Sequence, residues 1–303
     1  LMVLVIFLRH ALLGFSFQGI HSIMHPFQRN HVNYAASLSL FYPFIILMMG
    51  YYTKGSWQRK VLWGAAILVF AAVYFSYTRA AYVALIIALG VSFIIRWRLM
   101  RYTLIGVVIA TLIGVFQFVN DNKYLEYAPN YDRTISHENF DNLIEATYKM
   151  EDISTMERVY RWVAAGHMTP ERPLFGWGPG NFVNFYKSFT VTSFQTYVSD
   201  NPEQSGIHSY FLMTLVEQGV PGLIIFIALL FVFFMRGEKT YHALANYPDR
   251  QRMVLIVLLS TTVISAFLLI NDLIETDKVV PFFFINLAVF VNQELFLLRE
   301  KRK

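Results

Sequence analysis

Residues 102–119 read YTLIGVVIATLIGVFQFV, an apolar run that contains no charged side chain. Its length suits a helix that crosses the hydrocarbon core of a bilayer, which takes roughly 17–25 residues. Runs of the same kind occupy residues 33–52, 61–77, 80–95, 220–234, 253–270 and 279–298. Residues 1–13 are also apolar, and we expect them to be the end of an earlier span in a chain that begins inside a transmembrane helix. The sequence therefore predicts an all-α polytopic membrane protein with about seven full transmembrane helices and a truncated one at the N-terminus.

The composition agrees with a membrane protein. Charged residues make up 15% of the 303 residues and hydrophobic residues 56%, whereas soluble domains carry about 25% charged residues. The formal net charge of +5 is modest, and membrane topology explains it better than nucleic-acid binding, so we expect no nucleic-acid partner. Cysteine is absent, which excludes disulfides and thiolate sites. The histidines are scattered without metal-ligand spacing, so we expect no bound metal and no cofactor.

The lysine and arginine residues divide the connections between the apolar runs into two groups, basic and non-basic. They concentrate within residues 54–60, 96–101, 236–252 and 299–303. The positive-inside rule places these connections and the C-terminus in the cytoplasm, and the alternate connections outside. We therefore divide the chain into N-terminal transmembrane helices (1–119), a large extracytoplasmic loop with short helices (120–219), and C-terminal transmembrane helices with a basic cytoplasmic tail (220–303).

The large loop is acidic. Between residues 120 and 207 it holds 12 acidic and seven basic residues, a net charge of −5, so any anion site in it must be local. We expect one helix over residues 136–150 and a second that starts at the capping-box sequence STME, residues 154–157, and ends at Pro170. A glutamate deep in a span would be costly. We therefore expect residues 209–218 to form a short helix that lies on the membrane, with the next span beginning near Val220.

Several arginines lie where they could meet an anion. Arg79 occupies a turn so short that its side chain must sit at the outer membrane boundary. It can snorkel to lipid phosphates, or bind an anionic ligand, because guanidinium grips phosphate with two parallel hydrogen bonds. Arg29 and His31 lie at the same level of the membrane. They could belong to an ordinary polar loop at the interface or could bind a ligand. Arg158 and Arg161 share a face of the second loop helix, and a solvated surface with a local ion pair is the alternative to an anion site.

The sequence GWGPG at residues 176–180 predicts a tight turn. As a phosphate-binding loop it lacks a following Lys-Ser/Thr and a preceding strand. Gly176 and Gly178 are better explained by a close approach of the backbone to a neighbour or a ligand. His208 comes directly before a helical pattern, and we expect it in the first turn of that helix. The positive end of the helix dipole favours neutral imidazole, which can accept a proton, although an interfacial histidine that is merely hydrogen-bonded fits the pattern as well.

Four blocks, in order, resemble the O-antigen ligase and polymerase family of bacterial membrane glycosyltransferases. HVNYAA at residues 31–36 is similar to the family's outer Asn before a span with a Pro-rich stretch, here LFYPF at 40–44. SYTRAAYVAL at 76–85 is similar to its Ser-Arg-small-aromatic block, with two residues between the Ser and the Arg. RVYRW at 158–162 and PLFGWGPGNF at 173–182 resemble its R-x-x-x-W … P-L-x-G-x-G-x-x-x-F block. HSYFL at 208–212 and EQGVPG at 217–222 resemble its H-N-x-x-L … E-x-G-x-x-G block, with Ser209 in place of Asn.

The resemblance implies a metal-independent, inverting glycosyltransferase of the bacterial cytoplasmic membrane, active in the biosynthesis of cell-envelope polysaccharide such as lipopolysaccharide. Its partners would be a glycan donor carried on undecaprenyl diphosphate, a hydroxyl acceptor on a glycan or a lipid, and membrane lipids. The catalytic residues that it implies are His208 as general base and Arg158 and Arg79 as ligands of the leaving diphosphate. Residues that would bind substrate are Arg161, Arg29, Asn33, Gly176 and Gly178.

Two other classes of function remain open. A transporter of a small anion or of a polysaccharide precursor predicts ionisable residues in mid-span, and the runs 61–77, 102–119 and 279–298 contain almost none. A receptor that binds a lipid-linked sugar without turnover fits the same motifs. Ligase and polymerase share their chemistry and differ only in the acceptor, so the motifs do not separate them.

Overall fold

The computed structural model describes residues 1–127, 153–194, 199–202 and 204–300 of the chain. All regular secondary structure in these residues is helical, so the predicted all-α class is confirmed. The chain divides into two compact units. Unit 1 consists of residues 1–101, 231–267 and 273–303, and unit 2 of residues 102–230 and 268–272. The helix expected over residues 136–150 lies outside the described residues.

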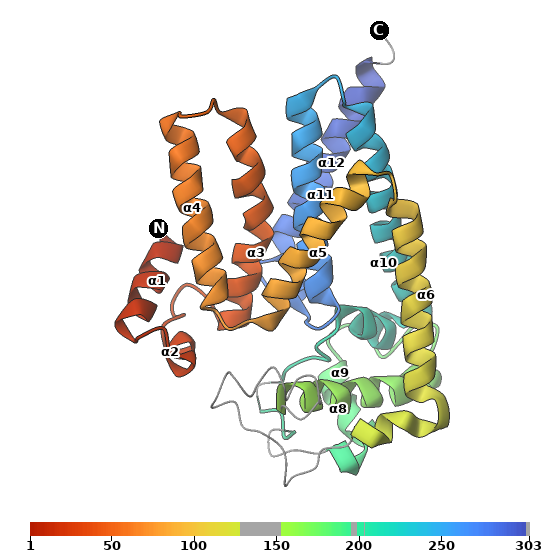
Figure 1. Ribbon diagram of the computed structural model, residues 1–303. Helices are drawn as coiled ribbons and strands as arrows, with labels where there is room; N and C mark the ends of the chain where they lie inside the picture. Colours follow the sequence, from red (N-terminus) through yellow and green to blue (C-terminus); the bar gives the residue numbers. More distant parts are fainter. Residues whose placement is uncertain (128–152, 195–198, 203, 301–303) are drawn as a thin grey trace. The chain divides into compact units, whose positions relative to one another are not determined.

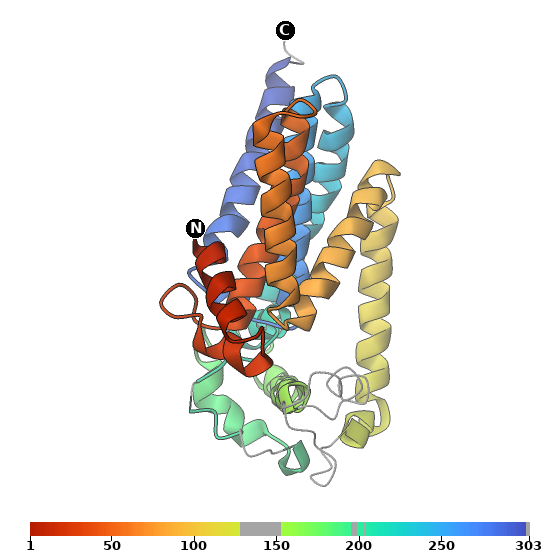
Figure 2. The same ribbon diagram turned by 60° about the vertical axis from the view of Figure 1, so that its left-hand side comes forward.

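Unit 1 contains the helices of the N-terminal third and most of the C-terminal ones (Figure 1). They are α1 (Met2–Leu12), α2 (Phe17–Ser22), α3 (His31–Met48), η1 (Met49–Tyr51), α4 (Trp57–Tyr74), α5 (Arg79–Arg96), the last part of α10 (Tyr210–Ala243), most of α11 (Pro248–Leu268), η6 (Leu273–Glu275) and α12 (Val280–Glu300). Helices α3 and α4 form an antiparallel pair, and α1 packs against α4 (Figure 2). Small side chains such as Ala35 and Ala66 are buried in this unit, which lets helix backbones approach closely.

Six helices among the described residues are long and apolar enough to cross a membrane: α3, α5, α6, α10, α11 and α12. Each predicted run corresponds to a helix, but α4, over the run 61–77, is not one of the six. Its first turn carries Gln58, Arg59 and Lys60, which lower its mean hydropathy. The count by length and composition is therefore six, where the sequence predicted about seven.

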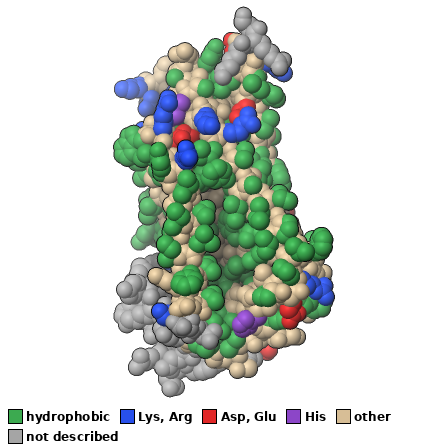
Figure 3. Space-filling view, turned by 90° about the vertical axis from the view of Figure 1, so that its right-hand side faces the viewer, with side chains coloured by type: hydrophobic (Ala, Val, Ile, Leu, Met, Phe, Trp, Pro, Cys, Tyr) green, Lys and Arg blue, Asp and Glu red, His purple; other side chains and the backbone are tan. Residues whose placement is uncertain are grey.

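The basic connections of unit 1 lie at one end. Tyr51 Oη donates to the carbonyl oxygen of Asp249 at 2.7 Å, which joins the α3–α4 and α10–α11 connections. Arg250 Nη1 donates to Gln293 Oε1 of α12 at 3.0 Å, and His242 Nε2 of α10 contacts the carbonyl oxygen of Ile95 of α5 at 2.8 Å. Figure 3 shows a group of Lys and Arg side chains at the end that carries the C-terminus. The positive-inside assignment requires the basic connections to lie on one side of the membrane, and this clustering agrees with it. The side of the membrane that this end faces stays a prediction.

Unit 2 contains most of α6, the long segment between α6 and α10, and the first part of α10. Its elements are α6 (Met100–Val119, of which the first two residues belong to unit 1), η2 (Asn120–Tyr127), α8 (Ile153–Met168), η3 (Thr169–Glu171), α9 (Phe182–Phe185), η4 (Tyr186–Phe189), η5 (Thr192–Phe194) and the first part of α10 (Tyr210–Ala243). Helix α8 buries Val159, Ala164 and Met168 against Phe182 and Tyr186. The second predicted loop helix is thus confirmed, because α8 starts one residue before the capping-box sequence and ends two residues before Pro170.

Helix α10 is interrupted at one residue. Gly219 has φ +73° and ψ −176°, which are not helical angles, so a short helix precedes it and a long one follows. A Cβ at this position would lie 2.4 Å from the carbonyl oxygen of Leu174, so only glycine fits here. The predicted break before Val220 is confirmed.

Candidate active site

His208 is held by its backbone at the entrance to α10. Its N–H donates to Asp272 Oδ2 at 2.8 Å, and its φ is +60°, in the left-handed region that non-glycine residues rarely adopt. Helix α10 begins two residues later, at Tyr210, so the expectation that His208 lies in the first turn is wrong. The reason is the left-handed backbone conformation of His208, which is not compatible with a right-handed helix, so the helix can begin only after this residue. Gly206 makes room for the Asp272 carboxylate, because a Cβ there would lie 2.6 Å from Asp272 Oδ2.

Arg161 contacts the imidazole of His208 directly. Its Nη1 lies 2.8 Å from His208 Nε2 and also donates to the carbonyl oxygen of Gly206 at 2.9 Å. Its Nη2 pairs with Glu157 Oε2 at 3.5 Å, one helical turn earlier on α8. Glu157 Oε1 in turn accepts from Ser199 Oγ at 2.7 Å. The Arg161 guanidinium is therefore buried and oriented by groups from three segments of unit 2.

This contact fixes the protonation of His208. A guanidinium can only donate, so Nε2 accepts and the ring is neutral with its proton on Nδ1. Burial and then the charges of Arg161 and Arg158 lower the pKa of His208 to about 3. The expected neutral imidazole agrees with this geometry, but a pKa this low makes the ring a weak general base, because a buried ring beside two cations resists protonation.

Asp272 carries a negative charge that compensates the positive charge of the nearby Arg161. Burial raises its pKa to about 6, although the hydrogen bonds from the His208 and Ser209 backbone and the charge of Arg161 act in the opposite direction. Asp272 therefore caps the start of α10 with a carboxylate. In the sequence it is one of three acidic residues in the short connection at residues 271–278, and no motif singles it out. Its pairing with His208, 64 residues away along the chain, is a product of the fold.

Arg158 lies on the same helix as Arg161. Its Nε donates to the carbonyl oxygen of Ile270 at 3.3 Å, which brings α8 against the segment that also carries Asp272. Three buried polar atoms around this point have no hydrogen-bond partner among the described residues: Arg161 Nε, Trp162 Nε1 and Asp272 Oδ1. Buried polar atoms are usually paired, so these two donors and one acceptor are available to a polar ligand.

The glycine turn packs against the interrupted part of α10. Gly176 and Gly178 both have positive φ, and a Cβ on Gly176 would lie 2.4 Å from the Glu217 carbonyl carbon. Gly178 N donates to the Glu217 carbonyl oxygen at 2.9 Å, and the Glu217 carboxylate accepts from Gly180 N and Phe182 N at 2.9 and 3.1 Å. The turn therefore approaches a neighbour, which accounts for Gly176 and Gly178. Contact of these two glycines with substrate stays a prediction.

The remaining predicted site residues belong to unit 1. Arg79 is the first residue of α5, in a turn held by a 2.5 Å hydrogen bond from Tyr77 Oη to the carbonyl oxygen of Phe15. Asn33 is buried in the first turn of α3, where its N–H donates to the capping side chain of Asn30 at 2.9 Å. Arg29 is exposed in the preceding connection. Inside unit 2 the structure brings Arg158, Arg161 and His208 together, and the convergence of Arg79 with them stays a prediction.

These features define a class: an all-helical, multi-pass membrane protein with a partly buried arginine–histidine–carboxylate cluster in a large loop unit. The family model of the O-antigen ligases matches residues 64–227, which is more than half of the 303 residues. The chain belongs to the O-antigen ligase family, and it is a membrane enzyme of the ligase or polymerase type. The match includes Arg79, Arg158, Arg161, the glycine turn and His208, whereas Arg29, Asn33 and Asp272 lie outside it. A search of the curated proteins finds no match for the chain.

Proposed function

We propose that this enzyme transfers or polymerises a glycan from an undecaprenyl-diphosphate carrier onto a hydroxyl acceptor, outside the bacterial cytoplasmic membrane. The observation that carries the proposal is the 2.8 Å contact between Arg161 Nη1 and His208 Nε2, with Arg158 close enough for its charge to lower the pKa of His208. Guanidinium donors suit a diphosphate, and a neutral imidazole suits proton removal from a hydroxyl. Both groups are therefore present in one partly buried cluster.

The proposed step is a direct displacement with inversion at the anomeric carbon. The acceptor oxygen forms a bond to that carbon, and the bond from the carbon to the diphosphate oxygen breaks with its electron pair leaving on the diphosphate. The acceptor proton passes to His208 Nε2. Arg158, together with Arg79 from unit 1, offsets the charge that develops on the leaving diphosphate, so this role needs no metal ion.

Binding of the donor would prepare His208 for this role. Arg161 occupies Nε2 and, with Arg158, lowers the pKa of the ring. A diphosphate that accepts hydrogen bonds from these guanidiniums offsets their charge and draws Nη1 of Arg161 away from the ring. Both effects raise the pKa of His208 toward the ordinary value of 6.5. The base therefore becomes effective only when the leaving group is in place.

Asp272 is a positioning residue in this scheme. It holds the His208 backbone at φ +60° through the 2.8 Å hydrogen bond and does not touch the imidazole nitrogen that takes the proton. The Glu217 carboxylate has a similar task for the glycine turn. Arg29 and Asn33 of unit 1 are second-rank candidates for contacts with the glycan.

Glycan transfer by purified protein with a polyprenyl-diphosphate-linked donor tests the proposal. His208→Ala and Arg158→Ala should each lower the rate by roughly 10²–10⁴-fold, and Asp272→Asn should retain more activity than Asp272→Ala, because the amide oxygen can still accept the His208 N–H. Lys123→Ala is the matched control, since it removes an exposed charge from the same unit. Wild-type rates from both His208→Ala and Arg158→Ala, with normal folding, would overturn the mechanism.

A further inference from the structure

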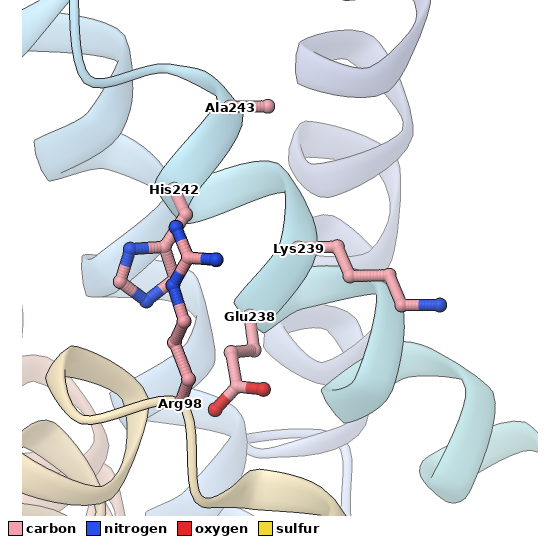
Figure 4. Close-up of a pocket in the computed structure, with 5 residues that line it drawn as sticks. All are labelled: Arg98, Glu238, Lys239, His242 and Ala243. Atoms are coloured by element: carbon pink, nitrogen blue, oxygen red, sulfur yellow. The ribbon is translucent and has the colours of Figure 1, made fainter.

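A polar cavity lies in unit 1, at the end where the basic connections cluster. It has a volume of about 320 Å³ and is lined by Arg98, Glu238, Lys239, His242 and Ala243 (Figure 4). Arg98 comes from the turn between α5 and α6, and the other four come from the second part of α10. None of these residues belongs to the proposed catalytic cluster.

The walls of this cavity are fixed by hydrogen bonds between elements. The buried Glu238 accepts from the Met100 N–H at 2.9 Å, which holds the start of α6 against α10. His242 Nε2 contacts the carbonyl oxygen of Ile95 at 2.8 Å, which holds the end of α5. Arg98, between these two anchors, has φ +60°, a conformation that helix ends usually assign to glycine. An arginine is therefore kept in a costly backbone conformation at the mouth of a cavity.

The charges around the cavity favour an anion. The lining contains two cations, Arg98 and Lys239, and one carboxylate, Glu238, which already accepts a hydrogen bond from Met100 N–H. Among the described residues, neither Arg98 nor Lys239 forms an ion pair with a carboxylate, whereas Arg236 nearby pairs with Glu294 at 2.8 Å. Figure 4 shows Arg98 extending beside His242, with Lys239 directed to the other side of α10.

An adjoining cavity adds an apolar wall. It has a volume of about 220 Å³, shares Lys239 and Ala243 with the first, and is lined also by Leu297 and Leu298 of α12, together with the paired Arg236 and Glu294. A polar cavity with two unpaired cations next to leucines matches a ligand with a phosphate head and an apolar remainder. Arginine and lysine are the usual partners of such a phosphate.

We propose that these two cavities bind an anionic phospholipid of the leaflet at the basic end of unit 1, with its phosphate beside Arg98 and the rest of its headgroup and its chains passing Lys239, which lines both cavities, toward Leu297 and Leu298. On the predicted topology this is the cytoplasmic leaflet, where anionic headgroups attract basic segments. The site would anchor the α5–α6 turn to α10 from the lipid side. It is independent of the glycan-transfer proposal.

Lipid binding to the purified full chain tests this site. The probes are short-chain phosphatidylglycerol, short-chain phosphatidylcholine and inorganic phosphate, and the readouts are native mass spectrometry and thermal stabilisation in uncharged detergent. Phosphatidylglycerol should bind and stabilise the chain more than phosphatidylcholine. The Arg98→Gln/Lys239→Gln variant should bind it about tenfold more weakly. The matched control Arg59→Gln/Lys60→Gln removes the same charge from the same end without touching either cavity, and it should bind like wild type.

Three results would overturn the proposal. Equal losses in the double variant and the control would show only a general attraction of basic residues for anionic lipid. Equal binding by both and by wild type would exclude the site. Stabilisation by inorganic phosphate as strong as by phosphatidylglycerol would assign the cavity to free phosphate. Ala243→Leu places a larger side chain in the wall that both cavities share and leaves the charge unchanged. It should also weaken lipid binding, which distinguishes the effect of cavity shape from the effect of charge.

Discussion

At the scale of single residues, the cluster around His208 turns on a charge balance that the sequence does not display. The imidazole has a pKa near 3 and its backbone anchor Asp272 a pKa near 6. The two shifts share one cause, burial, which disfavours the charged form of each group. The identities of Arg158, Arg161 and His208 were predictable from the motifs. A neutral His208 was also expected, but the extent to which its pKa is lowered was not, because it depends on burial and on the contact between Arg161 and His208 across 47 positions of the chain.

These shifts make a prediction about stability and pH. Between pH 6.5 and about 3 the unfolded chain protonates His208 and the folded chain does not, so His208 lowers stability as the pH falls, by up to about 1.4 kcal/mol per pH unit. Asp272 acts in the opposite sense between its ordinary pKa of 3.8 and about 6, where the folded chain keeps a proton that the unfolded chain has released. Replacing His208 should therefore flatten or reverse the loss of stability in acid.

Thermal unfolding of wild type and His208→Gln in detergent, from about pH 7 to about pH 4, measures this effect. The difference between the two should shift in favour of the variant as the pH falls below 6.5. The test is how the stability difference between wild type and variant changes with pH, because the substitution also changes the stability at neutral pH. Parallel profiles would mean that His208 is protonated as easily in the folded chain as in the unfolded one.

At the scale of elements, the glycine turn and the interruption of α10 form one structure. Pro173 accepts from Val220 N–H at 2.8 Å, and Val216 and Glu217 accept from Trp177 and Gly178 N–H at 2.9 Å each. The sequence pattern predicted both the tight turn and the break before Val220, because glycine and proline interrupt regular helices. It left open what the turn approaches. The answer, the Glu217 backbone, needs the fold, since 41 positions separate Gly176 from Glu217 in the chain.

Two glycines of this turn offer a matched pair of substitutions. Gly180 has φ +74° with no atom within 4 Å of a Cβ, whereas Gly176 has φ +65° and the Glu217 carbonyl carbon at 2.4 Å. Gly180→Ala should cost about 1–2 kcal/mol, from backbone strain alone. Gly176→Ala adds a clash with backbone that cannot move freely, so it should cost about 1–3 kcal/mol more. Thermal unfolding and protease sensitivity of the loop compare them, and equal effects would mean that the close approach to Glu217 does not matter.

At the scale of the whole molecule, hydropathy predicted every long helix because a bilayer selects for apolar runs of one length. It did not predict the division into two units, since α6 and α10 each continue from one unit into the other. It also treated α4 as equal to the other spans, although its first turn carries three polar side chains. Whether α4 crosses the membrane decides the side on which Arg79, at the start of α5, is placed.

Helix α4 has 18 residues, Trp57–Tyr74, about 27 Å at 1.5 Å per residue, which is close to the thickness of the hydrocarbon core. Arg59 and Lys60 lie near its start, where long side chains can reach the headgroups. We therefore predict that α4 crosses, so that the α3–α4 and α5–α6 connections share one side. Because this 303-residue sequence has no cysteine, single cysteines at Lys54 and Arg96 report their side without background. An impermeant maleimide should label both only after permeabilisation, and Asp277→Cys, exposed in the connection after α11, without it. Labelling of Lys54→Cys and Arg96→Cys from opposite sides would mean that one of α4 and α5 does not cross. If α5 is the one that does not, Arg79 and the His208 cluster would lie on opposite sides, because α6 alone would then cross between them.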